Sequence, residues 1–375
     1  MRILVLGAAG KAARATVYSL LGTRGVEHIY LADREAEALN KLGAELHGRP
    51  VSMRFLDAES ERGLRERMAE ADLVLGCLGP FHHHEARILE AALEARRDYI
   101  SLCDDGEATA VALSLAPDAE KRGVKVLCGC GMTPGLSNLL ASRAASRLQE
   151  THGIEISWYL GTGSRLGAAT IQHLLKISHG RAVSLEGGRG RKVLAGSGEE
   201  LVEFPPPVGW RVVSFLAHPE PSTLPRSVGK IMEVGFKGGV GARLGGMALQ
   251  WLAWLGEGEK SPIWKTALQT VADGVTNRGG GPSPSALRVT ATGMRGGADS
   301  KVTFAVTGDY YRLSGMMATA AVEQWMGGGW PCGVYPPEMI LDEPLFYSRL
   351  RRRGLRVLVG EERGGGGVDG RMMTA

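Results

Sequence analysis

Short apolar runs alternate with helical patterns through the first third of the chain. The first run, at residues 2–6, ends at Gly7, and a helical pattern over residues 12–21 follows it. Further runs of the same character occupy residues 28–32, 51–56, 71–78, 98–103 and 124–128. Strands that alternate with helices in this way build a parallel sheet, and ligands bind at the carboxyl ends of its strands. We therefore predict an α/β fold with a doubly wound parallel sheet.

The turn after the first run is rich in glycine and alanine. It reads GxxGxxA from Gly7 to Ala13 rather than a strict GxGxxG, but it lies between a strand and a helix, where a pyrophosphate binds. Asp33 ends the second run 20 residues beyond Ala13, which is the spacing of the acid that accepts hydrogen bonds from the adenosine ribose. These features predict a Rossmann domain that binds NAD, while Arg34 leaves NADP possible because its guanidinium could pair with a 2′-phosphate. The residues expected at the cofactor are Gly7, Ala8, Ala9, Gly10, Lys11, Ala12, Asp33, Arg34, Asp57, Gly79, Pro80 and Phe81.

The pattern changes after residue 154. Strands alternate there with glycine-rich loops, and a short turn joins two of them into an expected antiparallel hairpin over residues 286–307. We expect a second, α+β domain that holds the substrate, with flexible loops at 187–198 and 279–285. Its expected strands are 154–160, 211–216, 230–236, 287–294 and 300–306, and its expected helices are 168–179, 242–255, 262–273 and 313–326. The expected boundaries are 1–132 for the Rossmann domain, 133–332 for the substrate domain, 333–359 for a segment that packs back on the Rossmann domain, and 360–375 for a disordered tail.

Charge and composition exclude several classes of protein. Forty-four basic against forty acidic residues give a net charge of +4, which predicts no nucleic-acid partner and no basic membrane anchor. No apolar run approaches the roughly 18 residues of a membrane span, and the first strand begins too early for a leader peptide, so we expect a cytoplasmic protein. The chain has five cysteines, an odd number that favours no disulfide framework. Only one residue separates Cys128 from Cys130, which is too few for a zinc-binding pair, so no metal site is expected. The arginine cluster at 349–356 is interpreted as a solvated helix face.

A strand that ends in a Gly-x-x-Pro-Gly-x-x-Asn motif, at residues 131–138, resembles the saccharopine dehydrogenase-like family. The Gly-Pro-Phe loop at 79–81, the segment 204–226 with its His-Pro-Glu and Thr-Leu-Pro-Arg motifs, and the Gly-Val-Tyr-Pro-Pro-Glu motif at 333–338 are also similar to that family. Its members include saccharopine reductase, lysine 6-dehydrogenase and carboxynorspermidine dehydrogenase. The resemblance implies an NAD(P)-dependent oxidoreductase that transfers hydride at a C–N carbon of an amino acid, an opine or a polyamine through an imine. We further expect a small-molecule substrate and a homodimer formed through the second domain.

The Pro-Gly segment departs from the pattern of saccharopine reductases. Thr133 stands where they carry an aspartate, and segment 158–161 lacks their cysteine, so saccharopine is disfavoured and a lysine 6-dehydrogenase or another relative is favoured. Thr133 is expected to cap a helix that begins at Pro134. The free N–H groups of that helix, together with Thr133 and Asn138, would then bind an anionic or carbonyl group of the substrate.

The second domain supplies further candidates. Arg226 follows a threonine-containing loop as in the family, and an arginine fork pairs bidentately with a carboxylate, so we expect Arg226 to anchor the substrate. His218 is a further candidate for substrate binding. No acid or base stands out in the sequence; the catalytic candidates are Asp104 and Asp105, which follow a strand end, and His173.

Two other functions remain open. A semialdehyde-type dehydrogenase would use Cys130 as its nucleophile, because this cysteine follows a strand end of a domain with a Gly-Ala-Ala-Gly turn. A non-catalytic protein would bind the dinucleotide without turning over any amine, and the lack of an obvious acid/base pair is compatible with this class.

Overall fold

The computed structural model describes residues 1–161, 166–241, 284–363 and 373–374. The chain divides into two compact units, Met1–Leu136 with Tyr311–Arg353, and Ser137–Tyr310 with Gly354–Ala375. This division differs from the expected boundaries chiefly because the chain re-enters the first unit at Tyr311, ahead of the expected return at 333. The helices expected at 242–255 and 262–273, most of the loop at 279–285 and most of the tail at 360–375 lie outside the described residues. Among the described helices, none combines the length and the apolar character that crossing a bilayer requires.

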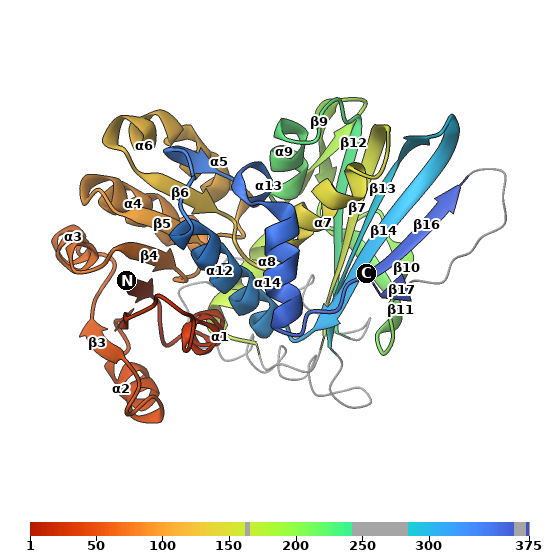
Figure 1. Ribbon diagram of the computed structural model, residues 1–375. Coiled ribbons are helices and arrows are strands. Elements are labelled where there is room, and N and C mark those ends of the chain that lie inside the picture. The colour runs from red at the N-terminus through yellow and green to blue at the C-terminus, as the bar shows by residue number, and fades with distance from the viewer. Residues whose placement is uncertain (162–165, 242–283, 364–372, 375) are drawn as a thin grey trace. The chain divides into compact units, whose positions relative to one another are not determined.

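The first unit is built on a sheet of seven parallel strands (Figure 1). Every neighbouring pair of strands is parallel. The strands, in spatial order, are β15 (Gly333–Tyr335), β6 (Lys125–Cys128), β5 (Asp98–Ser101), β4 (Leu73–Gly76), β1 (Arg2–Leu6), β2 (His28–Asp33) and β3 (Val51–Phe55). The order runs outward from β1 and β4 in both directions, which is the doubly wound arrangement predicted from the sequence. β15 adds a strand from the C-terminal part of the chain.

Helices cover both faces of this sheet. The unit contains α1 (Lys11–Leu20), α2 (Ala36–Glu45), α3 (Glu61–Ala69), α4 (Phe81–Glu94), α5 (Gly106–Ser114), α6 (Ala116–Arg122), nearly all of α12 (Tyr310–Met326), α13 (Pro337–Ile340) and α14 (Glu343–Arg352). Residues 3–6 of β1 are at most 2 % exposed, as expected for a strand that is covered on both sides. α12 packs closely on α1, because a Cβ on Gly315 would lie 2.7 Å from the carbonyl carbon of Ala15. Only glycine permits this approach of the two helices.

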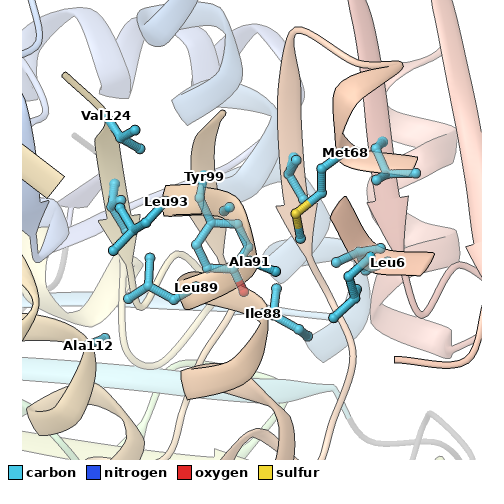
Figure 2. Close-up of a cluster of buried hydrophobic side chains, with 14 of the residues drawn as sticks. Leu6, Met68, Ile88, Leu89, Ala91, Leu93, Tyr99, Ala112 and Val124 are labelled. Carbon is cyan, nitrogen blue, oxygen red and sulfur yellow. The ribbon is translucent and has the colours of Figure 1, made fainter. Parts of the chain in front are cut away.

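Apolar side chains from α3, α4 and the strands form a closely packed core on one face of the sheet. Figure 2 shows the ring of Tyr99, from β5, in the middle of this cluster, with Leu93, Ile88 and Met68 around it. Tyr99 is 0 % exposed, so its hydroxyl group must find a partner inside the protein.

That partner is a buried carboxyl group. Glu85 of α4 is 0 % exposed, and its Oε2 accepts hydrogen bonds from the hydroxyls of Tyr99 at 3.0 Å and Ser101 at 2.9 Å. The sulfur atoms of Cys103 and Cys128 and the Glu85 carboxyl lie within 4.8 Å of one another. Burial raises the pKa of Glu85 to about 7, although the two hydrogen bonds act in the opposite direction. Burial also raises the pKa of Cys103 well above its usual value, so the thiol keeps its proton near neutral pH, while Glu85 keeps its own only below about pH 7.

We expect the first unit to lose stability as the pH rises from about 4.5 through about 7. A carboxyl with a raised pKa keeps its proton in the folded state at pH values where the unfolded chain has released it. Its contribution to the free energy of unfolding is therefore complete below the pKa of the unfolded state, and it is lost as the pH rises through the pKa of the folded state. The shift corresponds to about 3 kcal/mol. Glu85→Gln keeps an acceptor for both hydroxyls and should remove this dependence when chemical unfolding is compared at about pH 5 and about pH 8.

The matched control is Glu90→Gln, which removes the same charge from the exposed side of α4 and should leave the pH dependence of wild type. Equal pH dependence in the Glu85→Gln variant and the wild type would contradict a buried neutral Glu85.

The second unit is built on a mixed sheet, as expected for an α+β domain. Its strand order is β10-β11-β12-β7-β13-β14-β16-β17, and β8 pairs with both β12 and β9. β7 and β12 are parallel, the other pairs are antiparallel, and the hairpin expected at 286–307 is confirmed as β13 and β14. The strands are β7 (Glu150–Leu160), β8 (Arg181–Glu186), β9 (Arg189–Leu194), β10 (Glu200–Phe204), β11 (Gly209–Phe215), β12 (Glu233–Val240), β13 (Ser285–Arg295), β14 (Ala298–Gly308), β16 (Leu358–Arg363) and β17 (Met373–Thr374). The helices are α7 (Leu136–Ala145), α8 (Ala168–Ile177), α9 (Glu220–Thr223) and a 3₁₀ turn at Leu224–Arg226.

The expectation of a flexible loop at 187–198 is wrong for residues 187–194. β8 and β9 form an antiparallel hairpin there, and Gly187 and Gly188, both with positive φ, make its turn. The sequence pattern missed β9 because nearly all of its residues are exposed, so no apolar alternation marks it. β16 pairs with β14 in the second sheet and includes residues 360–363, the first residues of the expected tail.

Candidate functional site

The turn after β1 depends on glycine. Gly7 has a φ of +72°, and a Cβ at this position would lie 2.8 Å from the Cα of Leu78, so only glycine fits. Gly10 is the N-cap residue of α1, and its N–H donates to the Gly7 carbonyl at 2.9 Å. Because the N-cap has no side chain, the first N–H groups of α1 are left to other partners, which is the arrangement of an anion site.

The end of β2 lies against this turn. The Asp33 carboxylate accepts hydrogen bonds from the N–H of Ala9 at 2.9 Å and from the N–H of Glu35 at 3.0 Å. Arg34 comes next, with a side chain that is 62 % exposed and lies 3.4 Å from the Glu35 carboxylate. A fixed carboxylate and an exposed guanidinium therefore lie side by side at the position where a Rossmann domain holds the adenosine ribose.

The other residues expected at the cofactor follow β3 and β4. The Asp57 carboxylate accepts a hydrogen bond from the N–H of Glu59 at 3.0 Å, which is a local turn contact. Pro80 is the N-cap residue of α4, and Phe81 is its first residue. Because parallel strands end at the same edge of a sheet, the structure gathers the twelve expected positions at this edge. They are Gly7, Ala8, Ala9, Gly10, Lys11, Ala12, Asp33, Arg34, Asp57, Gly79, Pro80 and Phe81.

Asp104 and Asp105 follow β5 at the same edge. Asp105 is buried and caps α5, because its Oδ1 accepts a hydrogen bond from the N–H of Ala108 at 2.9 Å. The Nδ1 of His82 lies 4.0 Å from its Oδ2. Asp104 is half-buried. The capping contact gives Asp105 a structural reason to be present, and a catalytic role for either aspartate stays a prediction.

The Pro-Gly segment folds back on itself instead of starting a helix. The N–H of Gly131 donates to the Pro134 carbonyl at 2.8 Å, and the N–H of Leu136 donates to the Gly131 carbonyl at 3.0 Å. α7 begins only at Leu136, so the expectation that Thr133 caps a helix beginning at Pro134 is wrong. The reason is Gly135, whose φ of +124° turns the chain before the helix can start. Thr133 is buried in this loop, and its contact with a substrate stays a prediction.

Cys130 lacks the surroundings of a nucleophile. It is 0 % exposed, its thiol lies 3.9 Å from the carbonyl of Met317, and burial raises its pKa far above that of a free thiol. A nucleophilic cysteine needs a lowered pKa and access to the substrate. These properties argue against the semialdehyde-type alternative.

A buried polar cluster lies in the second unit. The Glu220 carboxylate, 0 % exposed, accepts a hydrogen bond from the Ser137 hydroxyl at 2.7 Å, and its other oxygen lies 2.5 Å from Nδ1 of His218. The Asn138 side-chain amide donates to the Thr223 hydroxyl at 3.1 Å. Three short elements supply these groups, namely the first turn of α7, the segment before α9, and α9 itself. The cluster joins a titratable imidazole to a carboxylate and two neutral polar groups inside the domain.

Aromatic rings fix the position of His218. Its ring stacks on Phe236 of β12, with centroids 4.1 Å apart and planes 8° from parallel. His173 of α8 approaches edge-on, with the centroids 5.9 Å apart. Both histidines are buried. The structure thus brings together the predicted residues His173, His218 and Asn138.

Sequence reasoning missed Glu220 and Ser137. Glu220 stands two residues after His218 in the His-Pro-Glu motif, and a buried histidine with a nearby acid is a recognisable signal for an imidazole–carboxylate pair. Ser137 gave no signal, because its partner lies 83 residues away in the chain.

Arg226 lies at the end of the 3₁₀ turn that follows α9. It is exposed, and its guanidinium makes no ion pair or hydrogen bond with any residue that the structure describes. The chain therefore carries an available cation three residues beyond Thr223 of the buried cluster.

Part of this chain matches a known protein family, and solved structures are similar to it. Residues 3–127 match the family described as the saccharopine dehydrogenase NADP binding domain. The apo saccharopine dehydrogenase (L-Glu forming) from Saccharomyces cerevisiae is similar with a TM-score of 0.68 at 12 % identity, over 96 % of this chain and 99 % of that chain. A probable dehydrogenase from Thermotoga maritima has a TM-score of 0.48 at 11 % identity, over 97 % of this chain and 98 % of that chain. The chain thus has the fold of saccharopine dehydrogenase, and its first third matches a family of nicotinamide-dinucleotide-binding domains.

Proposed function

We propose that this chain is an NAD(P)-dependent oxidoreductase that transfers hydride at a C–N carbon of an amino acid, an opine or a polyamine. The observation that carries the proposal is the buried pair of His218 and Glu220 in the second unit. Burying an imidazole and a carboxylate costs free energy. Such a pair is useful to an enzyme whose reaction moves protons, whereas a binding module does not need one. The family of the first domain supports the cofactor half of the proposal.

The turn after β1 suits a dinucleotide. At Gly7 a side chain would collide with the backbone, and at Gly10 a Cβ would stand 3.1 Å from the Gly7 carbonyl oxygen, so bare backbone faces the position of a pyrophosphate. The first N–H groups of α1 would hold the phosphates, and Asp33 would hold the ribose. When bound, the nicotinamide ring accepts or supplies the hydride.

His218 is the residue that we propose to carry the proton. An amine that loses hydride from its C–N carbon becomes an imine and must release a proton, and water then hydrolyses the imine. Glu220 lies against one nitrogen of the imidazole and is itself held by Ser137, so the ring keeps one orientation. The stacked ring of Phe236 limits rotation and excludes water from one face.

The test is a substrate screen with purified protein. Amino acids, polyamines and pairs of a keto acid with an amine are each mixed with NAD or NADP in oxidised or reduced form, and the absorbance of the reduced cofactor is followed. Turnover of at least one amine or imine-forming pair is the expected result. Tight cofactor binding without turnover of any of these compounds would favour the non-catalytic alternative and overturn the proposal.

The choice between NAD and NADP is predicted to depend on Asp33 and Arg34. The Asp33 carboxylate is held in place by two backbone N–H groups and would repel a 2′-phosphate, whereas the exposed Arg34 could pair with one. Asp33→Ser should weaken NAD binding about 10-fold or more, as expected when a charged hydrogen bond is lost, and strengthen NADP binding. Arg34→Ser should weaken NADP and leave NAD within about twofold. The measurement is the Kd of each cofactor by fluorescence, and equal changes for both cofactors would contradict the assignment.

We propose that Arg226 binds a carboxylate of the substrate. A lost charge-assisted pair is worth roughly 1.5 to 3 kcal/mol, so Arg226→Ala should lower kcat/KM about 10- to 100-fold. Arg226→Lys should recover only part of this, because an ammonium cannot reproduce the planar fork. Cofactor affinity should not change in either variant. A kcat/KM within twofold of wild type in Arg226→Ala would exclude this anchor.

A further inference from the structure

The first unit has a concave site away from the turn at Gly7, an open depression of about 910 Å³ where α1, α12 and α14 end. Such a volume lies within the range of small-molecule sites, roughly 300 to 1,000 Å³. The charged side chains that line the depression are Arg24, Arg349, Arg352, Arg353 and Glu323. Four guanidinium groups thus face one carboxylate, and Trp325 and Met326 supply an apolar part of the wall.

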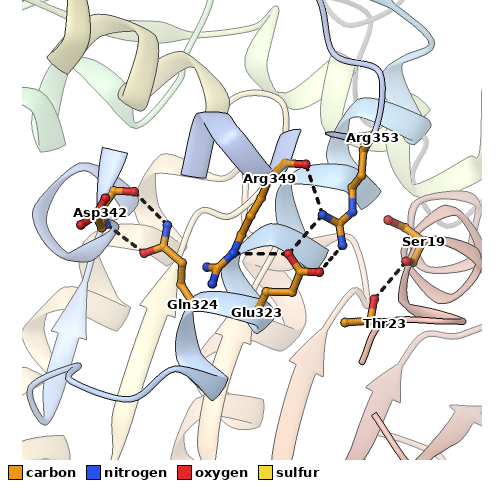
Figure 3. Close-up of polar contacts among 7 residues, drawn as sticks. All are labelled: Ser19, Thr23, Glu323, Gln324, Asp342, Arg349 and Arg353. Atoms are coloured by element: carbon orange, nitrogen blue, oxygen red, sulfur yellow. Dashed lines mark hydrogen bonds and ion pairs between the residues drawn. The ribbon is translucent and has the colours of Figure 1, made fainter. Parts of the chain in front are cut away.

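One carboxylate cannot balance this charge. Glu323 accepts hydrogen bonds from Arg353 at 2.5 and 3.1 Å, and Nε of Arg349 lies 3.5 Å from it. Figure 3 shows Arg349 of α14 and Arg353, the residue after α14, converging on Glu323, with Arg353 on the side of Ser19 and Thr23 in this view. The three helix ends contribute a partial charge of only about −0.5 each. A surplus of positive charge therefore remains in the depression.

Arg349 is the least satisfied of these groups. Its Nη1 is buried and has no hydrogen-bond acceptor among the residues that the structure describes. Burial lowers the pKa of Arg349, and Arg352 and Arg353 lower it further, while Glu323 opposes them. A buried guanidinium N–H without an acceptor costs free energy. The interpretation of segment 349–356 as a solvated helix face therefore fails at Arg349, whose side chain is only 14 % exposed.

The depression is distinct from the cofactor site. Its lining includes Met1, which precedes β1, and residues 22–25, which precede β2, so it lies at the amino edge of the parallel sheet. The turn at Gly7 lies at the carboxyl edge of the same strands. Five residues of β1 separate the two edges, which is roughly 16 Å at about 3.3 Å per residue. A ligand of one site does not reach the other.

We propose that this depression binds a small phosphate ester, with the phosphate among Arg349, Arg352 and Arg353 and the organic part against Trp325. Arginine forks pair bidentately with phosphate oxygens, and a dianion matches a surplus of more than one positive charge. An aromatic wall favours an ester that carries a ring or another apolar group.

The test is titration calorimetry on the whole chain saturated with its dinucleotide, so that the turn at Gly7 is occupied. The probes are phenyl phosphate and inorganic phosphate. Phenyl phosphate should bind, and Arg352→Ala should weaken it at least 10-fold. Arg351→Ala is the matched control, since it removes the same charge from the next position of α14 without lining the depression, and it should stay within twofold of wild type.

Arg349→Met provides a second variant, because it leaves the pair of Glu323 and Arg353 in place, and it should also weaken phenyl phosphate at least 10-fold. If inorganic phosphate binds as tightly as phenyl phosphate, the site is one for free phosphate, and the proposal of a phosphate ester is overturned. Absence of binding by cofactor-saturated wild type, or equal weakening in Arg351→Ala and Arg352→Ala, would overturn the site itself. Because Arg352 is exposed, its replacement tests the proposal even if Arg349→Met does not fold.

Discussion

Replacing His218 by asparagine should lower kcat by about 10²- to 10⁴-fold on the amine substrate, the usual effect of removing a general acid or base. Asparagine retains hydrogen-bonding capacity toward Glu220 but cannot take up a proton. The Kd of the dinucleotide should stay at its wild-type value, because the cofactor residues belong to the first unit. The measurement is steady-state kinetics over a range of pH, in which the variant should lose one limb of the wild-type profile.

Two further variants separate proton transfer from structure. Glu220→Gln keeps the size of the side chain and removes its charge, so as a positioning change it should lower kcat with little effect on KM and move the pH profile. His179→Asn, at an exposed position two residues after α8, is the matched control and should behave as wild type. A kcat of His218→Asn within fivefold of wild type would remove His218 from the mechanism.

The second large effect is expected at Gly10. Gly10→Asp should weaken dinucleotide binding at least 100-fold, because a carboxylate would stand beside the pyrophosphate. Two like charges about 4 Å apart repel by about 4 kcal/mol near a protein surface. The backbone at Gly10, with φ −67° and ψ 153°, is accessible to any residue, and aspartate is a good N-cap, so the fold should persist.

Gly10→Asn is the control that isolates the charge. Asparagine has nearly the same size, caps helices equally well and meets the Gly7 carbonyl oxygen in the same way, so any steric cost is common to both variants. The measurement is the Kd of the reduced cofactor by fluorescence, with circular dichroism to verify the fold. Similar affinities of the two variants would mean that no phosphate lies at the N-terminus of α1.

The parallel sheet could be predicted from the sequence chiefly because its central strands, such as β1 and β4, are buried on both faces. Such strands appear as continuous apolar runs, and each predicted run in the first unit forms a strand. The turn at Gly7 and the nearby Asp33 could also be predicted, because the strand, the turn and the helix are consecutive in the chain. Here local sequence and tertiary structure specify the same arrangement.

The polar cluster of the second unit could be predicted only in part. His218 and Asn138 stand in motifs, but the bond between Ser137 and Glu220 exists only after 83 residues of chain have folded. Exposed strands such as β9 carry no apolar alternation, and β15 has three residues, too few for any periodicity. Contacts of this kind depend on tertiary packing, for which a single sequence gives no local sign.

The chain leaves the first unit at Leu136 and returns at Tyr311, and this connectivity bears on synthesis by the ribosome. When residue 136 has emerged, β6 is still an open sheet edge, because β15 has not been made. The groove against α1 that receives Gly315 of α12 is likewise uncovered. Unpaired strand edges and exposed apolar surfaces promote aggregation. A truncated gene product that ends near residue 136 should therefore be insoluble, and the dinucleotide domain should be complete only after residues 311–353 have been translated.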